Sequence, residues 1–178
     1  MRFPLLSGLF VVITALFLSD ASFGQDSKDQ AATADSPTIL FVCEHGAAKS
    51  VIAAAYFNKL AKERGLKYRA VFRGTNPDPA LAMAAEKGLK EDGIDTHGWK
   101  PEMVTKKDMD AASRVVAMGC ALPEKDAVAG KIDEWNDISS VSQNYQVART
   151  EIVKKVQSLV DDLAKKEREA KGKKKTTP

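Results

Sequence analysis

Residues 38–50 read TILFVCEHGAAKS, and this stretch decides the fold class. Its opening run, TILFV, is apolar and rich in β-branched side chains, a pattern typical of a strand buried on both faces. From Lys49 onward the apolar side chains recur at helical spacing, and Gly65 is expected to end that helix. A strand, a tight loop at 43–48 and a helix therefore follow one another directly.

The rest of the domain alternates strands with helices in the same way. Further strands are expected at 68–72, 113–118 and 131–135, and further helices at 79–90 and from about residue 142 onward. This alternation predicts an α/β fold, in which helices cover a parallel sheet. Ligands of such sheets bind beyond the carboxyl ends of the strands, where the loop after the first strand falls. The last helix is expected to bury an apolar face made of Val147, Ile152, Val156, Leu159, Val160 and Leu163.

Composition and charge limit the class of protein. The chain has 178 residues with a formal net charge of +3, and its length suggests one domain. Residues 164–178 hold seven Lys or Arg against two Glu, so the other 163 residues carry a charge of −2. A nearly neutral body is not typical of nucleic-acid-binding proteins, and no nucleic-acid partner is expected. The two His and two Cys lack metal-ligand spacing, so we expect neither a metal nor a cofactor.

Residues 1–24 have the three-part layout of a secretory signal peptide. Arg2 precedes an apolar run over residues 3–18, and small side chains then suit cleavage after Gly24. The alternative is a retained membrane anchor, but the apolar run is shorter than the roughly 20 residues of a spanning helix. We therefore expect an exported protein, periplasmic or secreted, with no stable membrane anchor once the signal peptide is cleaved.

The remaining chain divides into three parts. Residues 25–36 are small and polar, which is typical of a linker. Residues 37–165 carry all the expected strands and helices and form the folded domain. Residues 166–178 are rich in Lys and end in Pro, and they cannot bury enough apolar area to fold. We expect them to form a basic disordered tail.

The loop that follows the first strand combines a nucleophile with an anion site. Small side chains in residues 44–48 let the backbone curl and direct several N–H groups at one point, next to a helix N-terminus. That field stabilises a Cys43 thiolate, the Ser50 hydroxyl can donate to it, and Lys49 adds a positive charge. Attack on phosphorus or arsenic requires this combination. The alternative is that Cys43 is only a small apolar residue that ends a core strand.

The chain resembles the low-molecular-weight protein tyrosine phosphatases and the thioredoxin-coupled arsenate reductases that share their fold. That family has a Cys, five residues, then Arg and Ser or Thr, and here Lys49 and Ser50 stand at those last two places. The resemblance covers nearly all of residues 38–163 in collinear order, including Arg73-Gly74-Thr75 and Val115–Met118. It implies a three-layer α/β sandwich with a short, four-stranded parallel sheet.

The resemblance also implies an activity, the hydrolysis of phosphate monoesters such as phosphotyrosine through a cysteinyl-phosphate. Cys43 would be the nucleophile, Ser50 would stabilise its thiolate, and Asp137 would be the general acid, with Asp133 as the other candidate. The partner would be a small phosphate or arsenate oxyanion, or a phosphorylated substrate. The oxyanion would be bound by residues of the loop, namely Glu44, His45, Gly46, Ala47, Ala48 and Lys49.

The loop departs from the family pattern at several positions. Lys49 replaces the Arg whose planar fork grips two phosphate oxygens, and an ammonium is only a point charge. The Asn usual in the family's loop is missing, and Gly46 sits one place later than expected. Glu44 brings a carboxylate beside the anion site. His45 is either an additional donor or an exposed loop residue.

Cys120 leads to a second interpretation. It follows the third expected strand, so it should lie at the same edge of the sheet as Cys43. In the arsenate reductases of this fold a resolving cysteine comes from this neighbourhood, which implies a thiol redox enzyme using Cys43 and Cys120. The alternative for Cys120 is a free, buried thiol. A third interpretation is a non-catalytic oxyanion-binding domain that lost turnover together with the Arg.

Overall fold

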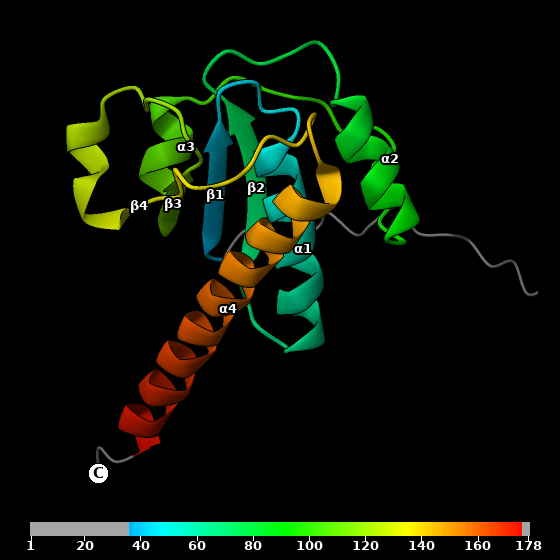
Figure 1. Cartoon of the computed structure of the whole chain (residues 1–178). Helices are drawn as coiled ribbons and strands as arrows, with labels where there is room; N and C mark the ends of the chain where they lie inside the picture. The colour runs from blue at the N-terminus through cyan, green and yellow to red at the C-terminus, as the bar shows by residue number, and fades with distance from the viewer. Residues whose placement is uncertain (1–35, 176–178) are drawn as a thin grey trace, which may run out of the picture. The chain divides into compact units, whose positions relative to one another are not determined.

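The computed structural model describes residues 36–175, and its centre is a sheet of four parallel strands (Figure 1). The strands are β1 (Thr38–Cys43), β2 (Arg69–Gly74), β3 (Arg114–Ala117) and β4 (Ile132–Glu134), in the order β2-β1-β3-β4. This confirms the four-stranded parallel sheet predicted from the sequence. The predicted signal peptide and all but the last residue of the predicted linker lie outside the described residues.

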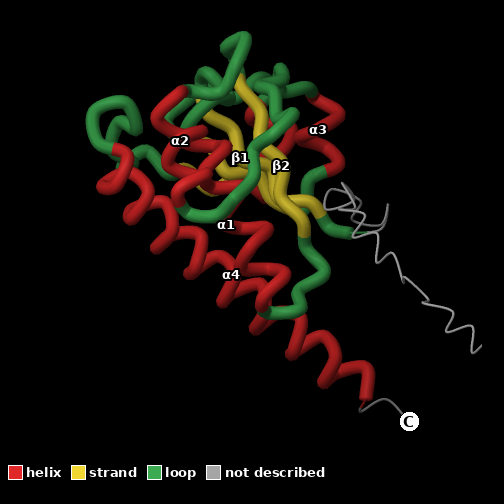
Figure 2. The backbone as a smooth tube through the Cα atoms, turned by 90° about the vertical axis from the view of Figure 1, so that its right-hand side faces the viewer, coloured by secondary structure: helices red, strands yellow, loops and turns green. Residues whose placement is uncertain are grey.

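Helices cover both faces of the sheet (Figures 1 and 2). On one face lie α1 (Lys49–Glu63), α2 (Met83–Glu91) and α4 (Tyr145–Lys175), with α1 and α4 side by side. On the other face lie α3 (Lys106–Ala111) and the 3-10 helix η1 (Lys125–Lys131). No helix among residues 36–175 is long and apolar enough to cross a membrane.

The central strand β1 supplies side chains to two separate cores. Its residues alternate between the faces of the sheet, so Phe41 and Cys43 point into the core under α1 and α4, whereas Val42 points into the core under α3. In the larger core the Phe41 ring packs against the rings of Phe57 and Trp135, at centroid distances of 6.1 and 5.7 Å. Burial on both faces explains why residues 39–42 are all apolar.

Helix α2 begins at Met83, four residues later than the position of Pro79 suggests. Residues 79–82 are instead non-helical, and the Ala82 N–H donates to the Ala47 carbonyl at 2.9 Å. The Pro at position 79 therefore does not open the helix. Residues 79–82 instead contact the loop that follows β1, through the hydrogen bond from Ala82 to Ala47.

Helix α4 differs from the prediction at two places. Val147 is 45% exposed, and the fully buried Ala148 occupies the apolar face in its stead. The helix also continues to Lys175, through residues for which the sequence indicates a disordered tail. Contacts across the helix turns and with the α1–β2 connection stabilise this extension, since Glu167 pairs with Lys171 and accepts from the Lys67 N–H.

Candidate active site

Cys43 ends strand β1 and lies against the first turn of α1. Its side chain is buried, with 6% of the residue exposed, and Ser50 is fully buried beside it. The Cys43 sulfur and the Ser50 hydroxyl oxygen are 3.1 Å apart, within hydrogen-bond distance. A hydroxyl held there can donate to a thiolate. Cys43 and Ser50, which are seven positions apart in the sequence, are therefore in contact in the fold.

The loop that follows Cys43 is held along its length by the segment after β2. The carbonyls of Cys43, Glu44 and His45 accept hydrogen bonds from the N–H groups of Thr75, Asn76 and Asp78, at 3.1, 2.8 and 3.0 Å. In a trans peptide, the N–H that follows points to the side opposite the carbonyl. The N–H groups of Glu44, His45 and Gly46 therefore point away from this segment. Several N–H groups pointing to one side of a loop form an anion-binding concavity.

A close approach of two glycines fixes the curl of the loop. Gly46 has φ +59°, a backbone conformation that L side chains rarely adopt. A Cβ at Gly46 would lie 2.7 Å from the Gly74 nitrogen, and a Cβ at Gly74 would lie 2.8 Å from the Gly46 nitrogen. Both positions therefore require glycine. The small residue that the sequence places at 46 serves this packing as well as the turn.

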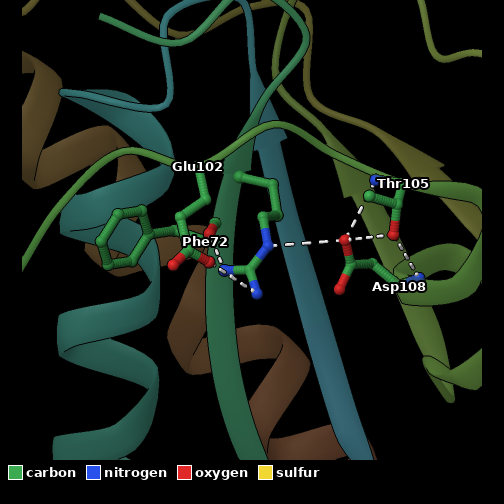
Figure 3. A network of polar contacts seen from close by, with 5 residues as sticks. Phe72, Glu102, Thr105 and Asp108 are labelled. Carbon is green, nitrogen blue, oxygen red and sulfur yellow. Dashed lines mark hydrogen bonds and ion pairs between the residues drawn. The ribbon is translucent and has the colours of Figure 1, made fainter. Parts of the chain in front are cut away.

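An ionic network stabilises the β2 side of the contact between Gly46 and Gly74 (Figure 3). Arg73 pairs with Glu102 at 3.0 Å and with Asp108 at 3.5 Å, and its guanidinium also donates to the Phe72 carbonyl. Asp108 and Thr105 form a reciprocal capping box at the start of α3. The segment before α3 is thereby fixed to β2, where Gly74 exchanges backbone hydrogen bonds of 2.8 Å with residues 102 and 104.

Lys49 connects the start of α1 to the loop before α4. Its ammonium nitrogen donates to the Ile138 carbonyl at 2.8 Å. That loop is also tied to α4, because Glu151 accepts from the Ser139 N–H and hydroxyl at 2.7 and 2.9 Å. An ammonium has three donors, so the contact with Ile138 leaves Lys49 able to donate to an anion as well.

The two carboxylates considered as general acids each form an ion pair. Asp137 has a side chain that is 71% exposed and pairs with Lys155 at 2.9 Å. The hydrogen bond from Lys155 lowers the pKa of Asp137, so its carboxyl group holds a proton less well. Asp133 pairs with Arg114 at 2.8 Å, toward the amino end of β3. The structure thus does not bring Asp133 to Cys43, which lies at the carboxyl edge.

His45 stands on the loop itself, between two carboxylates. Its Nδ1 lies 3.1 Å from an Asp78 oxygen and its Nε2 lies 3.8 Å from a Glu44 oxygen. About half of the His45 side chain is exposed. Sequence reasoning missed Asp78, which lies 33 residues from His45 along the chain; an Asp just before a Pro is more often read as a turn former.

Cys120 lies near the same edge of the sheet as a free thiol. Cys43 and Cys120 form no disulfide, and the Cys120 sulfur donates to the Val42 carbonyl at 3.5 Å. Burial raises the pKa of the Cys120 thiol to about 11, and the nearby negative charges of Cys43 and Glu44 act in the same direction. Cys120 therefore remains a protonated thiol at neutral pH.

A second polar cluster, which the sequence does not reveal, joins three helices at Asp92. One carboxylate oxygen of Asp92 accepts from the hydroxyls of Tyr56 and Tyr145, at 2.7 and 2.8 Å, and from Arg149 Nε at 2.7 Å. Burial would raise the pKa of Asp92, but these hydrogen bonds outweigh it and lower the pKa. The Tyr145 ring fills the space above Gly88, so a side chain at 88 would displace it.

The part of the chain that the structure describes contains no group of three or more His, Cys, Asp or Glu side chains arranged to hold a metal ion.

Comparison with known proteins agrees with this geometry. The family model of the low molecular weight phosphotyrosine protein phosphatases matches residues 38–134, from the start of β1 to the end of β4. The chain belongs to this family. Its members are cysteine-dependent hydrolases, and arsenate reductases are among the solved structures that share its fold. A comparison with curated proteins gave no match.

Three similar solved structures illustrate the shared fold. The YwlE arginine phosphatase from Geobacillus stearothermophilus has a TM-score of 0.63 at 22% identity, covering 75% of this chain and 96% of that one. For the arsenate reductase from Archaeoglobus fulgidus the TM-score is 0.56 at 25% identity, with coverages of 69% and 98%. For the low molecular weight protein tyrosine phosphatase from T. tengcongensis it is 0.58 at 22% identity, with coverages of 71% and 99%.

Proposed function

We propose that this protein hydrolyses phosphate monoesters, with aryl esters such as phosphotyrosine as its substrates, through a cysteinyl-phosphate on Cys43. The observation that carries the proposal is the 3.1 Å contact between the Cys43 sulfur and Ser50, at the start of a loop whose first carbonyls are bound by the segment after β2. A nucleophile and a preorganised set of donors thus share one short loop.

The proposed reaction uses each part of this loop. The Cys43 thiolate attacks phosphorus, and the Ser50 hydroxyl stabilises it before attack and as it returns at the end of the cycle. The backbone N–H groups of 44–49 bind the three phosphoryl oxygens, whose charge grows in the transition state. Lys49, anchored by Ile138, contributes a positive charge in place of the bidentate Arg.

The state of Cys120 favours hydrolysis over a thiol redox cycle. A resolving cysteine must attack as a thiolate, so its rate of attack is low when only a small fraction of the thiol is deprotonated. Burial raises the pKa of Cys120 to about 11, so that fraction is small at neutral pH. Cys120 also donates to the Val42 carbonyl, which holds its sulfur toward strand β1.

The test is an aryl phosphate assay on the full chain, with Cys43→Ser and Cys120→Ser measured beside the wild type. Turnover that is lost in Cys43→Ser and kept in Cys120→Ser supports the proposal. Phosphate binding without turnover in the wild type would identify an oxyanion-binding domain instead. Thiol-dependent reduction of arsenate that disappears in Cys120→Ser would identify a reductase.

We further propose that the protein acts after export, as a periplasmic or secreted enzyme. The support is the sequence of residues 1–24, with its single cation and apolar run. Fractionation of cells that express the full chain, followed by N-terminal sequencing, tests this. A mature chain that begins at Gln25 in the exported fraction is the expected result, and an intact Met1 in the cytoplasmic fraction contradicts it.

A further inference from the structure

The ends of α1 and α4 lie next to each other at the amino edge of the sheet, where the strands begin and which is opposite to Cys43. Both helices start near the carboxyl ends of the strands and run toward the amino edge (Figures 1 and 2). Arg64, just after α1, pairs with Asp161 of α4, and the Lys67 N–H donates to Glu167. Helix α1 has 15 residues, so at about 1.5 Å per residue its end lies roughly 22 Å from its start beside Cys43.

This end of the fold concentrates the positive charge of the chain. Residues 59–67 and 161–175 together hold eleven Lys or Arg against five Asp or Glu, a net charge of +6. The whole chain carries +3, so all its other residues together carry −3. We call these two segments the basic pole. A protein with its charge divided in this way turns its positive end toward a negative surface.

Most cations of the basic pole are exposed and available to a partner. Arg64 and Lys171 form ion pairs with Asp161 and Glu167. Five others are exposed, and within residues 36–175 their side chains form no ion pair or hydrogen bond: Lys59, Lys67, Lys165, Lys166 and Arg168. The last turns of α4 also extend beyond the sheet and beyond the end of α1, which leaves them open to a flat surface (Figures 1 and 2).

The basic pole presents charge without large apolar or aromatic groups. Among the residues that the structure describes, the exposed large hydrophobic side chains are Met83, Met103 and Val147, all outside the pole. A stable protein–protein interface has an apolar or aromatic centre, and single-stranded nucleic acid is held by aromatic stacking. An anionic lipid surface requires neither, because each Lys or Arg near it strengthens binding roughly fivefold by charge.

We propose that the basic pole binds this protein reversibly to an anionic phospholipid membrane, with the loop after Cys43 facing away from the lipid. The choice of a membrane over double-stranded nucleic acid rests on the proposed export, because an exported protein meets lipid surfaces. The orientation follows from the fold, since Cys43 ends β1 at the carboxyl edge and the pole lies at the amino edge. Binding by charge alone is screened by salt.

The experiment measures the partition of the full chain onto two kinds of vesicle, phosphatidylcholine alone and phosphatidylcholine mixed with phosphatidylglycerol. The readout is the ratio of the two partition coefficients, because the apolar run of residues 1–24, where it is retained, acts on both lipids alike. In 0.1 M NaCl we expect the anionic vesicles to be favoured at least about 100-fold, which three cations supply at roughly fivefold each. In 1 M NaCl, where the Debye length is about 3 Å, the ratio should approach one.

Two double variants test the two segments of the pole separately. Lys165→Gln with Lys166→Gln should lower the ratio roughly 25-fold, since two cations are removed. Lys59→Gln with Lys67→Gln should lower it by a similar factor, because the pole acts as one surface.

The matched control removes the same charge at the carboxyl edge. Lys100 and Lys107 are exposed there, next to the segment that Gly74 binds through residues 102 and 104. Lys100→Gln with Lys107→Gln should leave the ratio nearly unchanged. Turnover of a soluble aryl phosphate should be the same in the wild type and in all three double variants, because none of these lysines belongs to the proposed catalytic loop.

Each other outcome overturns the inference. A wild-type ratio near one in 0.1 M NaCl, or a ratio that survives 1 M NaCl, would exclude binding by the charge of the pole. An equal fall in the control would mean that net charge acts without a defined surface. An effect of the α4 pair without one of the Lys59 and Lys67 pair would confine binding to the end of α4. Duplex DNA that displaces the protein from anionic vesicles at equal phosphate concentration would make nucleic acid the partner.

These results are independent of the proposed hydrolysis and of the proposed export. A chain that binds anionic vesicles as expected but has no aryl phosphate turnover would refute the hydrolysis alone. A chain with turnover but without preference for anionic lipid would refute the membrane surface alone. The N-terminal sequence of the chain recovered from cells tests export separately.

Discussion

The contact between Gly46 and Gly74 leads to a quantitative prediction for Gly46→Ala. An alanine there must adopt φ +59°, a conformation that costs a residue with a Cβ about 1–2 kcal/mol. Its Cβ would also lie 2.7 Å from the Gly74 nitrogen, well inside an ordinary van der Waals contact. Because the neighbouring atoms are backbone, relief requires the two segments to move apart, and such overpacking costs about 1–3 kcal/mol.

Gly65→Ala provides the control that separates these two costs. Gly65 has nearly the same backbone conformation, φ +64°, but a Cβ added to it would meet nothing within 4 Å, and it stands at the far end of α1. We expect urea unfolding to show a loss of about 1–2 kcal/mol for Gly65→Ala and of about 2–5 kcal/mol for Gly46→Ala. The difference between them measures the packing of the loop against β2.

The same variant should affect activity more than stability alone would suggest. Displacing the loop from Gly74 moves its N–H groups relative to Cys43, and misplacement of reacting groups by about 1 Å costs on the order of 10²-fold in rate. We expect a loss of that size in aryl phosphate turnover for Gly46→Ala and little change for Gly65→Ala. Equal destabilisation by the two substitutions, with activity kept in both, would refute the described packing of the loop.

Three further predictions concern the groups around this loop. Asp92→Asn should lower the free energy of unfolding by about 2–3 kcal/mol near pH 7, because charge-assisted hydrogen bonds are lost. Since the pKa of Asp92 is lowered in the fold, this difference should shrink as the pH falls below about 4. Urea unfolding of the exposed control Asp161→Asn should change by no more than about 1 kcal/mol. Lys49→Ala should weaken phosphate binding, measured by the rise in melting temperature with added phosphate. Lys49→Arg should raise turnover if the guanidinium reaches the oxyanion. Unchanged phosphate affinity in Lys49→Ala would show that Lys49 only binds the Ile138 carbonyl. In Cys43→Ser, alkylation of Cys120 by iodoacetamide should be slow at neutral pH and accelerate toward pH 11, and rapid modification at pH 7 would contradict its burial.

The features that could be predicted from the sequence are those encoded locally. The run Ile39–Val42 can only be a buried strand, and the spacing of Cys43 and Ser50 places both at one turn between strand and helix. Helix α3 was missed because it has six residues and a single buried side chain, Met109. Its capping box, Thr105 with Asp108, was the signal that could have found it.

The remaining features depend on contacts between distant parts of the chain. His45 meets Asp78 across 33 positions, and Lys49 meets the Ile138 carbonyl across 89. No periodicity or spacing encodes such pairs, because they arise only when the helices have packed on the sheet. The ion pair between Asp137 and Lys155 is of the same kind, since Lys155 belongs to α4 and only the fold brings the two together.

Helix α4 is the last element of the chain, and this order affects how the protein matures. The Asp92 carboxylate accepts hydrogen bonds from Tyr56, 36 positions away in the sequence, and from Arg149, 57 positions away. The face of α1 that carries Ile52 and Phe57 packs in the same core as α4. Contacts so far apart along the chain form late in folding. A nascent chain that has not yet reached residue 145 must therefore leave this face uncovered. Such a chain is a target for chaperones and a risk for aggregation until its final helix has been synthesised.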